Sequence, residues 1–264
     1  IQGKRLYKVR ARSCILATGA SEQHVVFRNN DLPGIALCSA IDRLMLHYGV
    51  RPAQQLAVLA GNDQAYYTAL NAHDAGVAVQ AVIDMRPEPD NPQLKSALQT
   101  RGIARFGSAT VFEAESCKAQ QRLKGVAVHA LGRDEGTVAE PLAYLACDAL
   151  AMSAGFMPAY QLACQGGATL HYDDESARFS LRNLPEGMFL AGAVNGRYGL
   201  DAVRADGRNA ARHALRHLAM ATAEDEDSQC FERVNYPWPI FKHPKGREFV
   251  DFDEDLQIKD IVNA

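Results

Sequence analysis

Two short apolar runs on either side of a helical pattern dominate the first third of the chain. Residues 56–60 (Leu-Ala-Val-Leu-Ala) and 77–83 (Val-Ala-Val-Gln-Ala-Val-Ile) are predicted to be strands, and residues 65–74 between them a helix that ends at Ala75-Gly76. A strand, a tight turn, a helix and a second strand within about 30 residues form a βαβ unit. Because these strands are almost continuously apolar, they predict a parallel sheet that is covered on both faces.

The same spacing rules predict the remaining elements. An alternating pattern predicts an opening strand that ends at Leu16. Helices are predicted over residues 39–48, 93–100 and 200–220, and β-like runs over 125–131 and 144–151. Linkers are predicted at 87–92, which is bounded by prolines, and at 222–228, where an acidic run favours a solvated segment. The tail that follows is rich in Pro and aromatic residues and contains the only Trp, Trp238.

Composition narrows the class of protein. Of the 264 residues 47% are hydrophobic and 22% charged, which is enough to fill a core and excludes an intrinsically disordered chain. The net charge of −3 offers no basic field to a nucleic-acid backbone. No apolar run approaches the ~20 residues of a membrane span, and no signal peptide opens the chain. We therefore expect no nucleic-acid partner and no membrane partner.

The cysteines indicate the compartment. The chain has six, none of them in a C-x-x-C pair: Cys14, Cys38, Cys117, Cys147, Cys164 and Cys230. In a chain of this length, scattered cysteines are typical of free thiols in a reducing compartment, and not of a disulfide framework or a zinc ribbon. We expect a cytoplasmic protein.

The turn after the first buried strand occupies the place of a dinucleotide fingerprint, G-x-G-x-x-G. Its glycines would let backbone N–H groups approach a pyrophosphate closely, but here the three positions are Ala60, Asn62 and Ala65. Gly61 within the turn and Asp84, about 20 residues further on, are the candidate contacts to a phosphate and a ribose. The alternative is a Rossmann-like layer that has lost its nucleotide, with Asp84 merely ending a strand.

Three segments are short strands that end in a turn of small residues. They are residues 14–20, 148–155 and 187–196. A glycine after a buried strand lets the backbone approach a ligand or a neighbouring domain, although a single such turn is more often plain packing. The recurrence of the pattern favours a ligand-binding role.

Other candidates for chemistry are weaker. His213 and His217 share a helix face but have no third ligand, so solvated histidines stabilised by the helix dipole are the simpler interpretation. The serines lack a G-x-S-x-G context, which gives an esterase no support. We therefore predict no catalytic residue and no metal ligand.

Taken together, these segments resemble the two-dinucleotide-domain flavoprotein disulfide reductase superfamily, in which an NAD-type domain is inserted into an FAD-type domain. Residues 15–20 (Ile-Leu-Ala-Thr-Gly-Ala) resemble the segment where the chain leaves the first domain. Residues 148–158 resemble the return segment, and residues 187–196 the strand that normally ends in Gly-Asp beneath the flavin.

That resemblance implies a Rossmann-like, three-layer α/β fold from which the N-terminal portion of the first domain is missing. It divides the chain into the end of the FAD-type domain (1–34), the inserted NAD-type domain (35–152), the return of the first domain (153–221), and a linker and tail (222–264). We therefore expect a fragment of a longer polypeptide that is inactive alone.

A closer resemblance is to the α-subunit family of heterotetrameric sarcosine oxidases. It rests on residues 17–20 followed by 30–34, on 62–66, on 190–196, and on 249–256 with 259–261 near the end. Related opine oxidase and cyanide synthase subunits tend to have an iron–sulphur cysteine pair near the last segment. This sequence has none there, which favours the sarcosine oxidase side.

The closer resemblance implies a flavoenzyme complex that oxidatively demethylates sarcosine or a similar secondary amine. Its cofactors would be NAD and flavin (FAD and FMN), and its partners would be the β subunit together with smaller subunits. The residues implied near the bound dinucleotide, besides Gly61 and Asp84, are Thr18, Gly19, Gly192, Asn195 and Gly196.

Two departures keep other interpretations open. Without a C-x-x-C pair there is no dithiol relay, so disulfide reductase chemistry is not expected. Ala193 replaces the Asp that normally bonds a flavin ribityl chain, and Asn195 would have to supply an amide in its place. The alternatives are a non-catalytic scaffold that docks partner subunits, or a subunit of an opine oxidase or of an NAD(FAD)-dependent dehydrogenase relative.

Overall fold

The structure, a computed structural model, describes residues 7–117, 121–227 and 234–264. The chain forms two compact units. Unit 1 comprises residues 1–21 and 157–232, and unit 2 comprises residues 22–156 and 233–264. The chain passes between the units within strands β2 (Ala20–Gln23) and β11 (Gly155–Pro158).

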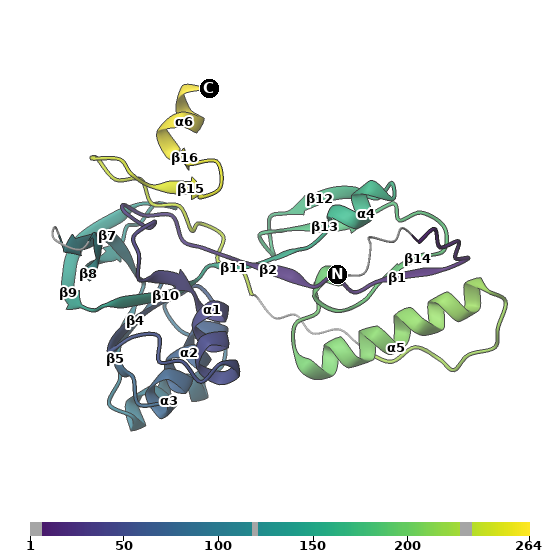
Figure 1. The fold of residues 1–264 in the computed structure, drawn as a ribbon, viewed down its shortest axis with the longest axis horizontal. Helices are drawn as coiled ribbons and strands as arrows, with labels where there is room; N and C mark the ends of the chain where they lie inside the picture. The colour runs from purple at the N-terminus through teal and green to yellow at the C-terminus, as the bar shows by residue number, and fades with distance from the viewer. Residues whose placement is uncertain (1–6, 118–120, 228–233) are drawn as a thin grey trace, which may run out of the picture. The chain divides into compact units, whose positions relative to one another are not determined.

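The larger unit 2 contains most of the regular elements (Figure 1). In chain order they are β3 (Ile35–Leu37), α1 (Cys38–Asp42), the π-helix η1 (Arg43–His47), β4 (Gln55–Ala60), α2 (Asp63–Asp74), β5 (Ala78–Asp84), α3 (Pro92–Thr100), β6 (Ala104–Gly107), β7 (Ala109–Cys117), β8 (Arg122–Leu131), β9 (Val138–Ala146), β10 (Ala149–Ser153), β15 (Phe249–Asp251), β16 (Leu256–Gln257) and α6 (Ile258–Asn263).

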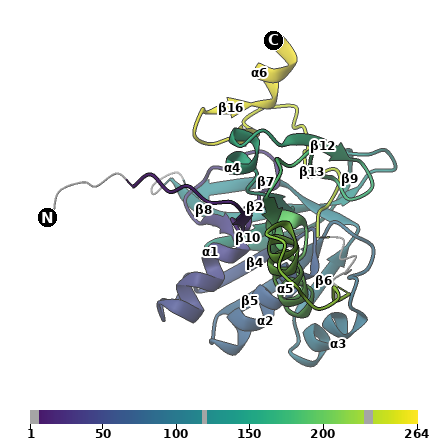
Figure 2. The same ribbon diagram turned by 90° about the vertical axis from the view of Figure 1, so that its right-hand side faces the viewer.

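A parallel sheet in the order β3-β10-β4-β5-β6 forms the centre of unit 2. Helices α1, α2 and α3 cover one face, and the antiparallel sheet β7-β8-β9 covers the other (Figures 1 and 2). Strand β4 shows how the sequence specifies both layers. Leu56 and Val58 pack toward the helices, whereas Ala57 and Leu59 pack toward β7 and β8. The predicted βαβ unit and the predicted layered α/β fold are confirmed.

The β-like run predicted over residues 144–151 is two strands. Antiparallel β9 ends at Ala146 and parallel β10 begins at Ala149. Between them, the Asp148 carboxylate accepts hydrogen bonds from the backbone N–H groups of Gln54 and Gln55, at 2.8–3.1 Å. This anchor at the start of β4 redirects the chain from the antiparallel sheet into the parallel one.

Residues 234–264 of the predicted linker and tail (222–264) pack with unit 2. Phe241 is 1% exposed and Phe249 9%. The backbone of Phe249 exchanges hydrogen bonds with the buried side chain of Asn30, which accepts at 3.0 Å and donates at 2.8 Å. Val25 and Phe27 lie in the same cluster, so residues 22–34 also pack with unit 2. These boundaries depend on long-range packing, which composition does not encode.

Unit 1 is built on the parallel pair β1 (Cys14–Leu16) and β14 (Met188–Leu190) and the hairpin β12 (Thr169–Asp173) and β13 (Arg178–Arg182). It also contains α4 (Gln161–Gln165), the 3₁₀ turn η2 (Gly192–Asn195) and the long helix α5 (Leu200–His217). The alternating pattern before Leu16 predicts a longer opening strand, but residues 7–13 have no regular structure and are mostly exposed. Residues 1–6 lie outside the described part.

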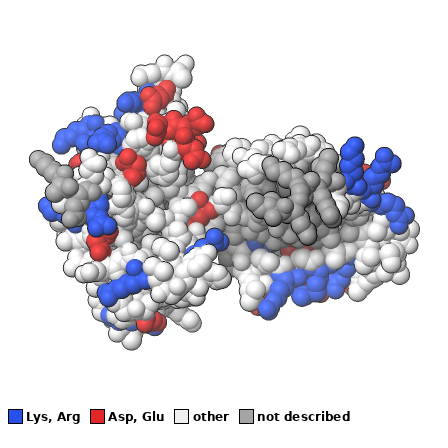
Figure 3. All heavy atoms as spheres, viewed as in Figure 1, with Lys and Arg blue, Asp and Glu red and all other residues white. Residues whose placement is uncertain are grey.

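The acidic segment after α5 is not a free solvated linker. Asp225 and Glu226 turn back onto the helix, whose Arg side chains gather on one surface (Figure 3). Arg216 and His213 contact Asp225, and their hydrogen bonds lower the pKa of its carboxyl to about 2. Arg208 and Arg212 bond Glu226 and lower its pKa to about 2 in the same way. These basic residues are spaced so that their side chains lie on one helix face, and their charge attracts the carboxylates.

Among the described helices, none is long and apolar enough to cross a membrane.

The stability of unit 2 is predicted to fall as the pH decreases from about 6.5 toward about 5. Burial lowers the pKa of His24 and of His243 from the ordinary 6.5, opposed by hydrogen bonds to backbone at His24 and by Glu113 at His243. As the pH falls below about 6.5, these two rings therefore take up protons more readily in the unfolded chain than in the folded one.

Urea unfolding measured across this pH range checks the prediction. His243→Asn should flatten the slope of stability against pH, because it removes one of the two titrating rings. The Asn carbonyl can replace the ring Nδ1 that accepts from the Lys245 N–H, so the fold is kept. Equal slopes for the wild type and for His243→Asn would contradict this assignment.

Candidate functional site

The predicted residues of unit 1 meet at the carboxyl ends of β1 and β14. The two strands are parallel, with Leu16 opposite Leu190, and the Ala191 N–H donates to the Leu16 carbonyl at 2.9 Å. Thr18 and Gly19 follow β1, and Gly192 follows β14. Because the two parallel strands end at the same edge, these residues lie at that edge. Ligands of open α/β sheets bind at such an edge.

Thr18 and Gly19 are held by the return segment of the chain. The Thr18 hydroxyl donates to the Ala159 carbonyl at 2.8 Å, and the Ala159 N–H donates to the Gly19 carbonyl at 3.0 Å. Gly19 has φ +77°, a left-handed conformation that favours glycine, and no neighbouring atom lies where its Cβ would be. The loop is thus fixed on one side and open on the other.

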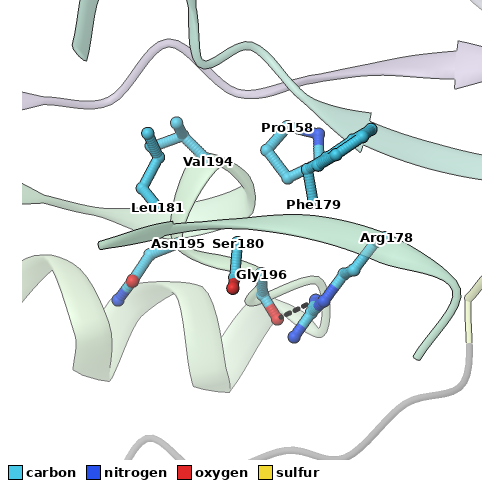
Figure 4. Close-up of a pocket in the computed structure, with 8 residues that line it drawn as sticks. All are labelled: Pro158, Arg178, Phe179, Ser180, Leu181, Val194, Asn195 and Gly196. Atoms are coloured by element: carbon cyan, nitrogen blue, oxygen red, sulfur yellow. Dashed lines mark hydrogen bonds between the residues drawn. The ribbon is translucent and has the colours of Figure 1, made fainter. Parts of the chain in front are cut away.

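The second loop is a tight turn between β14 and α5. The predicted strand over residues 187–196 is β14 followed by the 3₁₀ turn η2, in which Gly192 has φ +78° and Gly196, just after it, φ +72°. The Arg178 guanidinium donates to the Gly196 carbonyl at 3.1 Å, and a Cβ on Gly196 would collide with it (Figure 4). The φ and the close approach both require glycine at position 196.

A small pocket lies between this turn and the β12–β13 hairpin (Figure 4). Arg178, Ser180 and Asn195 contribute its polar groups, and Val194 is among its apolar ones. Its volume of about 50 Å³ is too small for a nucleotide or a flavin ring. The pocket is therefore a gap in packing beside the turn.

Asp206 on α5 determines the shape of the turn. Its carboxylate is 5% exposed and accepts from the Gly192 N–H at 2.8 Å and from the Asn195 amide at 3.0 Å. Asn195 is predicted to offer its amide to a cofactor, but this amide donates to Asp206 within the protein. Asp206 was not predicted from the sequence, although it lies between Val203 and Ala210 on the apolar stripe of the helix. A carboxylate on such a stripe needs a buried partner.

Helix α5 begins directly after this turn without a capping side chain. Gly199 is the N-cap, and it offers no side-chain cap hydrogen bond. The first N–H groups of a helix have no partner within it, and the helix dipole makes this end positive. The residues present therefore fit an electron-rich group of a dinucleotide or flavin.

The two predicted residues of unit 2 lie at the carboxyl ends of β4 and β5. Strands β4 and β5 place Ala60 opposite Asp84, and the Met85 N–H donates to the Ala60 carbonyl at 2.9 Å. A Cβ on Gly61 would lie 2.9 Å from the side chains of both Met85 and Tyr236. Gly61 is thus packed against the chain itself, where the prediction places a phosphate.

Asp84 is fully buried and its oxygens already have donors. The Tyr66 hydroxyl donates to one oxygen at 2.6 Å, and the Arg86 N–H and Nε donate to the other at 2.9 and 3.1 Å. Burial and the Asp84 charge raise the pKa of Tyr66, so this hydroxyl remains a donor. The residues at this edge do not fit a ribose of NAD.

The histidines of α5 have protein partners. His213 bonds Asp225 at 2.9 Å, and His217 bonds the Arg12 carbonyl at 3.1 Å. In the described part of the chain, no three His, Cys, Asp or Glu side chains gather closely enough to hold a metal ion. The five cysteines in the described part of the chain are free, and Cys230 lies outside it.

Comparison with known proteins gives the relatives of the chain. Over 269 residues it is 33% identical to the alpha subunit of sarcosine oxidase from Rhizobium meliloti, a match that covers 98% of this chain and 25% of that protein. Over 277 residues it is 30% identical to the alpha subunit of sarcosine oxidase from a Corynebacterium species, covering 100% of this chain and 28% of that protein. The chain is a relative of sarcosine oxidase α subunits, as predicted. It spans about a quarter of the length of these curated relatives.

Similarity to opine oxidase is weaker. The chain is 24% identical to one subunit of the opine oxidase of Agrobacterium tumefaciens, over 92% of this chain and 50% of that protein. No family model matches the chain.

Solved structures share the fold. Thioredoxin reductase of T. acidophilum superposes with a TM-score of 0.59 at 19% identity, over 79% of this chain and 66% of that one. L-proline dehydrogenase from P. horikoshii superposes with a TM-score of 0.54 at 18% identity, over 81% of this chain and 36% of that one. At these identities the likeness shows the fold alone, which is the predicted Rossmann-like α/β fold.

Replacing Asp206 is predicted to destabilise unit 1. Asp206→Ala leaves the Gly192 N–H and the Asn195 amide without their buried acceptor, at a cost of about 1–3 kcal/mol in the free energy of unfolding. Urea unfolding measures the loss. Asp201→Asn on the same helix, whose side chain is fully exposed, is the control and should change stability by less than about 0.5 kcal/mol. Equal effects of the two substitutions would refute the role given to Asp206.

Proposed function

We propose that this chain is the nucleotide-domain portion of a sarcosine oxidase-like α subunit. The complex would be a cytoplasmic flavoenzyme that oxidatively demethylates sarcosine or a similar secondary amine. The 33% identity to such a protein over 98% of this chain is the observation that supports the proposal. The similar proteins are named as subunits, which supports the presence of further subunits as partners.

In this proposal the chain binds and positions a dinucleotide and has no catalytic residue of its own. The loops at Thr18-Gly19 and Gly192–Gly196 form the binding edge of unit 1. Their support is the meeting of two strand ends, the left-handed glycines and the uncapped start of α5. When bound, a flavin would accept electrons from an amine, and NAD would exchange a hydride.

Gly61 and Asp84, predicted to bind the same class of cofactor, are not part of this site. The packing of Tyr236 on Gly61 and the donors around Asp84 leave neither residue a free face. The closed state of this turn is the observation that favours the second candidate, a non-catalytic scaffold that docks partner subunits. The two candidates differ in whether unit 1 binds a dinucleotide.

Cofactor binding by the purified polypeptide separates them. We expect FAD or NAD to bind, detected by flavin absorbance and fluorescence and by calorimetry. Thr18→Val should weaken that binding about 2- to 10-fold, because the loop loses its hydroxyl hydrogen bond to Ala159. Thr169→Val is the matched control, since this hydroxyl bonds a carbonyl within the β12–β13 hairpin.

A polypeptide that binds neither FAD nor NAD would favour the scaffold. Equal weakening by Thr18→Val and Thr169→Val would show that the loop at Thr18 is not the binding edge.

A further inference from the structure

Unit 2 has the topology of a dinucleotide-binding sheet, and its ligand position is defined by that topology. In such sheets a pyrophosphate lies at the carboxyl end of the first βαβ strand, over the N-terminus of the helix that follows. In unit 2 this strand is β4 and the helix is α2, so the position is the turn at Gly61 and Asn62.

The side chain of Asn62 occupies that position. Asn62 is 3% exposed, and its Oδ1 accepts from the Ala65 N–H in the first turn of α2 at 3.3 Å. This donor is one that a phosphate oxygen would otherwise use. The Nδ2 of Asn62 donates to the Ser153 hydroxyl and to the Val234 carbonyl, both at 3.0 Å. One amide therefore caps the helix and ties it to β10 and to the tail.

The tail segment 234–236, which we call the strap, lies across the same edge. The Tyr236 N–H donates to the Ala154 carbonyl at 2.8 Å, and the Asn235 side chain accepts from the Phe156 N–H at 2.7 Å. A Cβ on Gly61 would lie 2.9 Å from the Cβ of Tyr236, and a Cβ on Gly155 would collide with Asn235. These two glycines therefore make room for the strap, which is the role that fingerprint glycines have toward a phosphate.

The ribose side of the edge is closed as well. Asp84 is fully buried, and Arg86 pairs with it and with Asp63 at the start of α2. Burial, and after it the charge of Asp84, raises the pKa of Tyr236 in the strap. An acidic side chain that would bind ribose hydroxyls thus serves as the counter-ion of an internal arginine.

We infer that the dinucleotide position of unit 2 is filled by the chain itself, with Asn62 in place of the phosphate and the strap in place of the rest of the nucleotide. Unit 2 is then a closed module that binds no dinucleotide, and its Rossmann topology is used for packing. This closure concerns unit 2 alone and holds whether or not unit 1 binds a cofactor.

The substitution Asn62→Asp tests it at constant size. Asp keeps the cap on Ala65, but its second oxygen cannot donate and repels the Val234 carbonyl. Asn91→Asp is the matched control, because Asn91 caps α3 through the Gln93 N–H and, within the described residues, its side chain has no bond to the strap. Both variants keep a helix cap, and only the first loosens the strap.

Hydrogen exchange of the Tyr236 amide and NAD titration by calorimetry are the two measurements. We expect Asn62→Asp to speed exchange at Tyr236 about tenfold or more and Asn91→Asp to leave it unchanged. The NAD affinity, or the lack of one, should be the same in the wild type and in Asn62→Asp. Unchanged exchange at Tyr236 in Asn62→Asp would overturn the claim that Asn62 holds the strap. Tenfold weaker NAD binding in this variant would overturn the claim that the dinucleotide position of unit 2 is closed. Absence of NAD binding in all three proteins would support the closure of unit 2 and would leave FAD as the cofactor that unit 1 has to bind under the proposed function.

Discussion

Unit 2 depends on one constraint: a parallel sheet has to be covered on both faces. Along β4 the apolar side chains alternate between a helical layer and the antiparallel sheet, and both sets are fully buried. The antiparallel layer is completed by the tail, because Phe241 packs in the same cluster as β7 and β8. The tail therefore has to run back over unit 2, and the strap at residues 234–236 lies on this path. Closure of the nucleotide edge follows from how the sheet is covered.

Each unit shapes a strand-to-helix turn with one buried polar side chain, but with opposite results. In unit 1, Asp206 lies on helix α5 and accepts from the Gly192 N–H, so the carboxylate is not itself part of the turn. In unit 2, Asn62 lies within the turn itself and uses both ends of its amide there. The proposed dinucleotide edge therefore lies in unit 1, and the proposed closure removes the corresponding edge of unit 2.

Local patterns predicted the fold where they are strong, and failed where contacts are long-range. The βαβ unit at residues 56–84 is correct because burial on both faces gives its strands a continuous apolar pattern. Strand β7 and the β12–β13 hairpin were not predicted, since the burial of their residues is mixed and gives no regular alternation. At the site, a degraded fingerprint was visible in Asn62 and Ala60. The partner of Asn62 at Val234 is 172 residues away, which no local pattern encodes.

The most direct test is a hydrogen-exchange map of the purified polypeptide with and without saturating dinucleotide, using FAD and NAD in turn. An open edge in unit 1 predicts slower exchange at residues 17–20 and 192–200. A closed edge in unit 2 predicts no change at residues 60–66 and 84–86. Protection at the turn around Gly61 and Asn62, without protection at the Gly192 turn, would contradict both assignments.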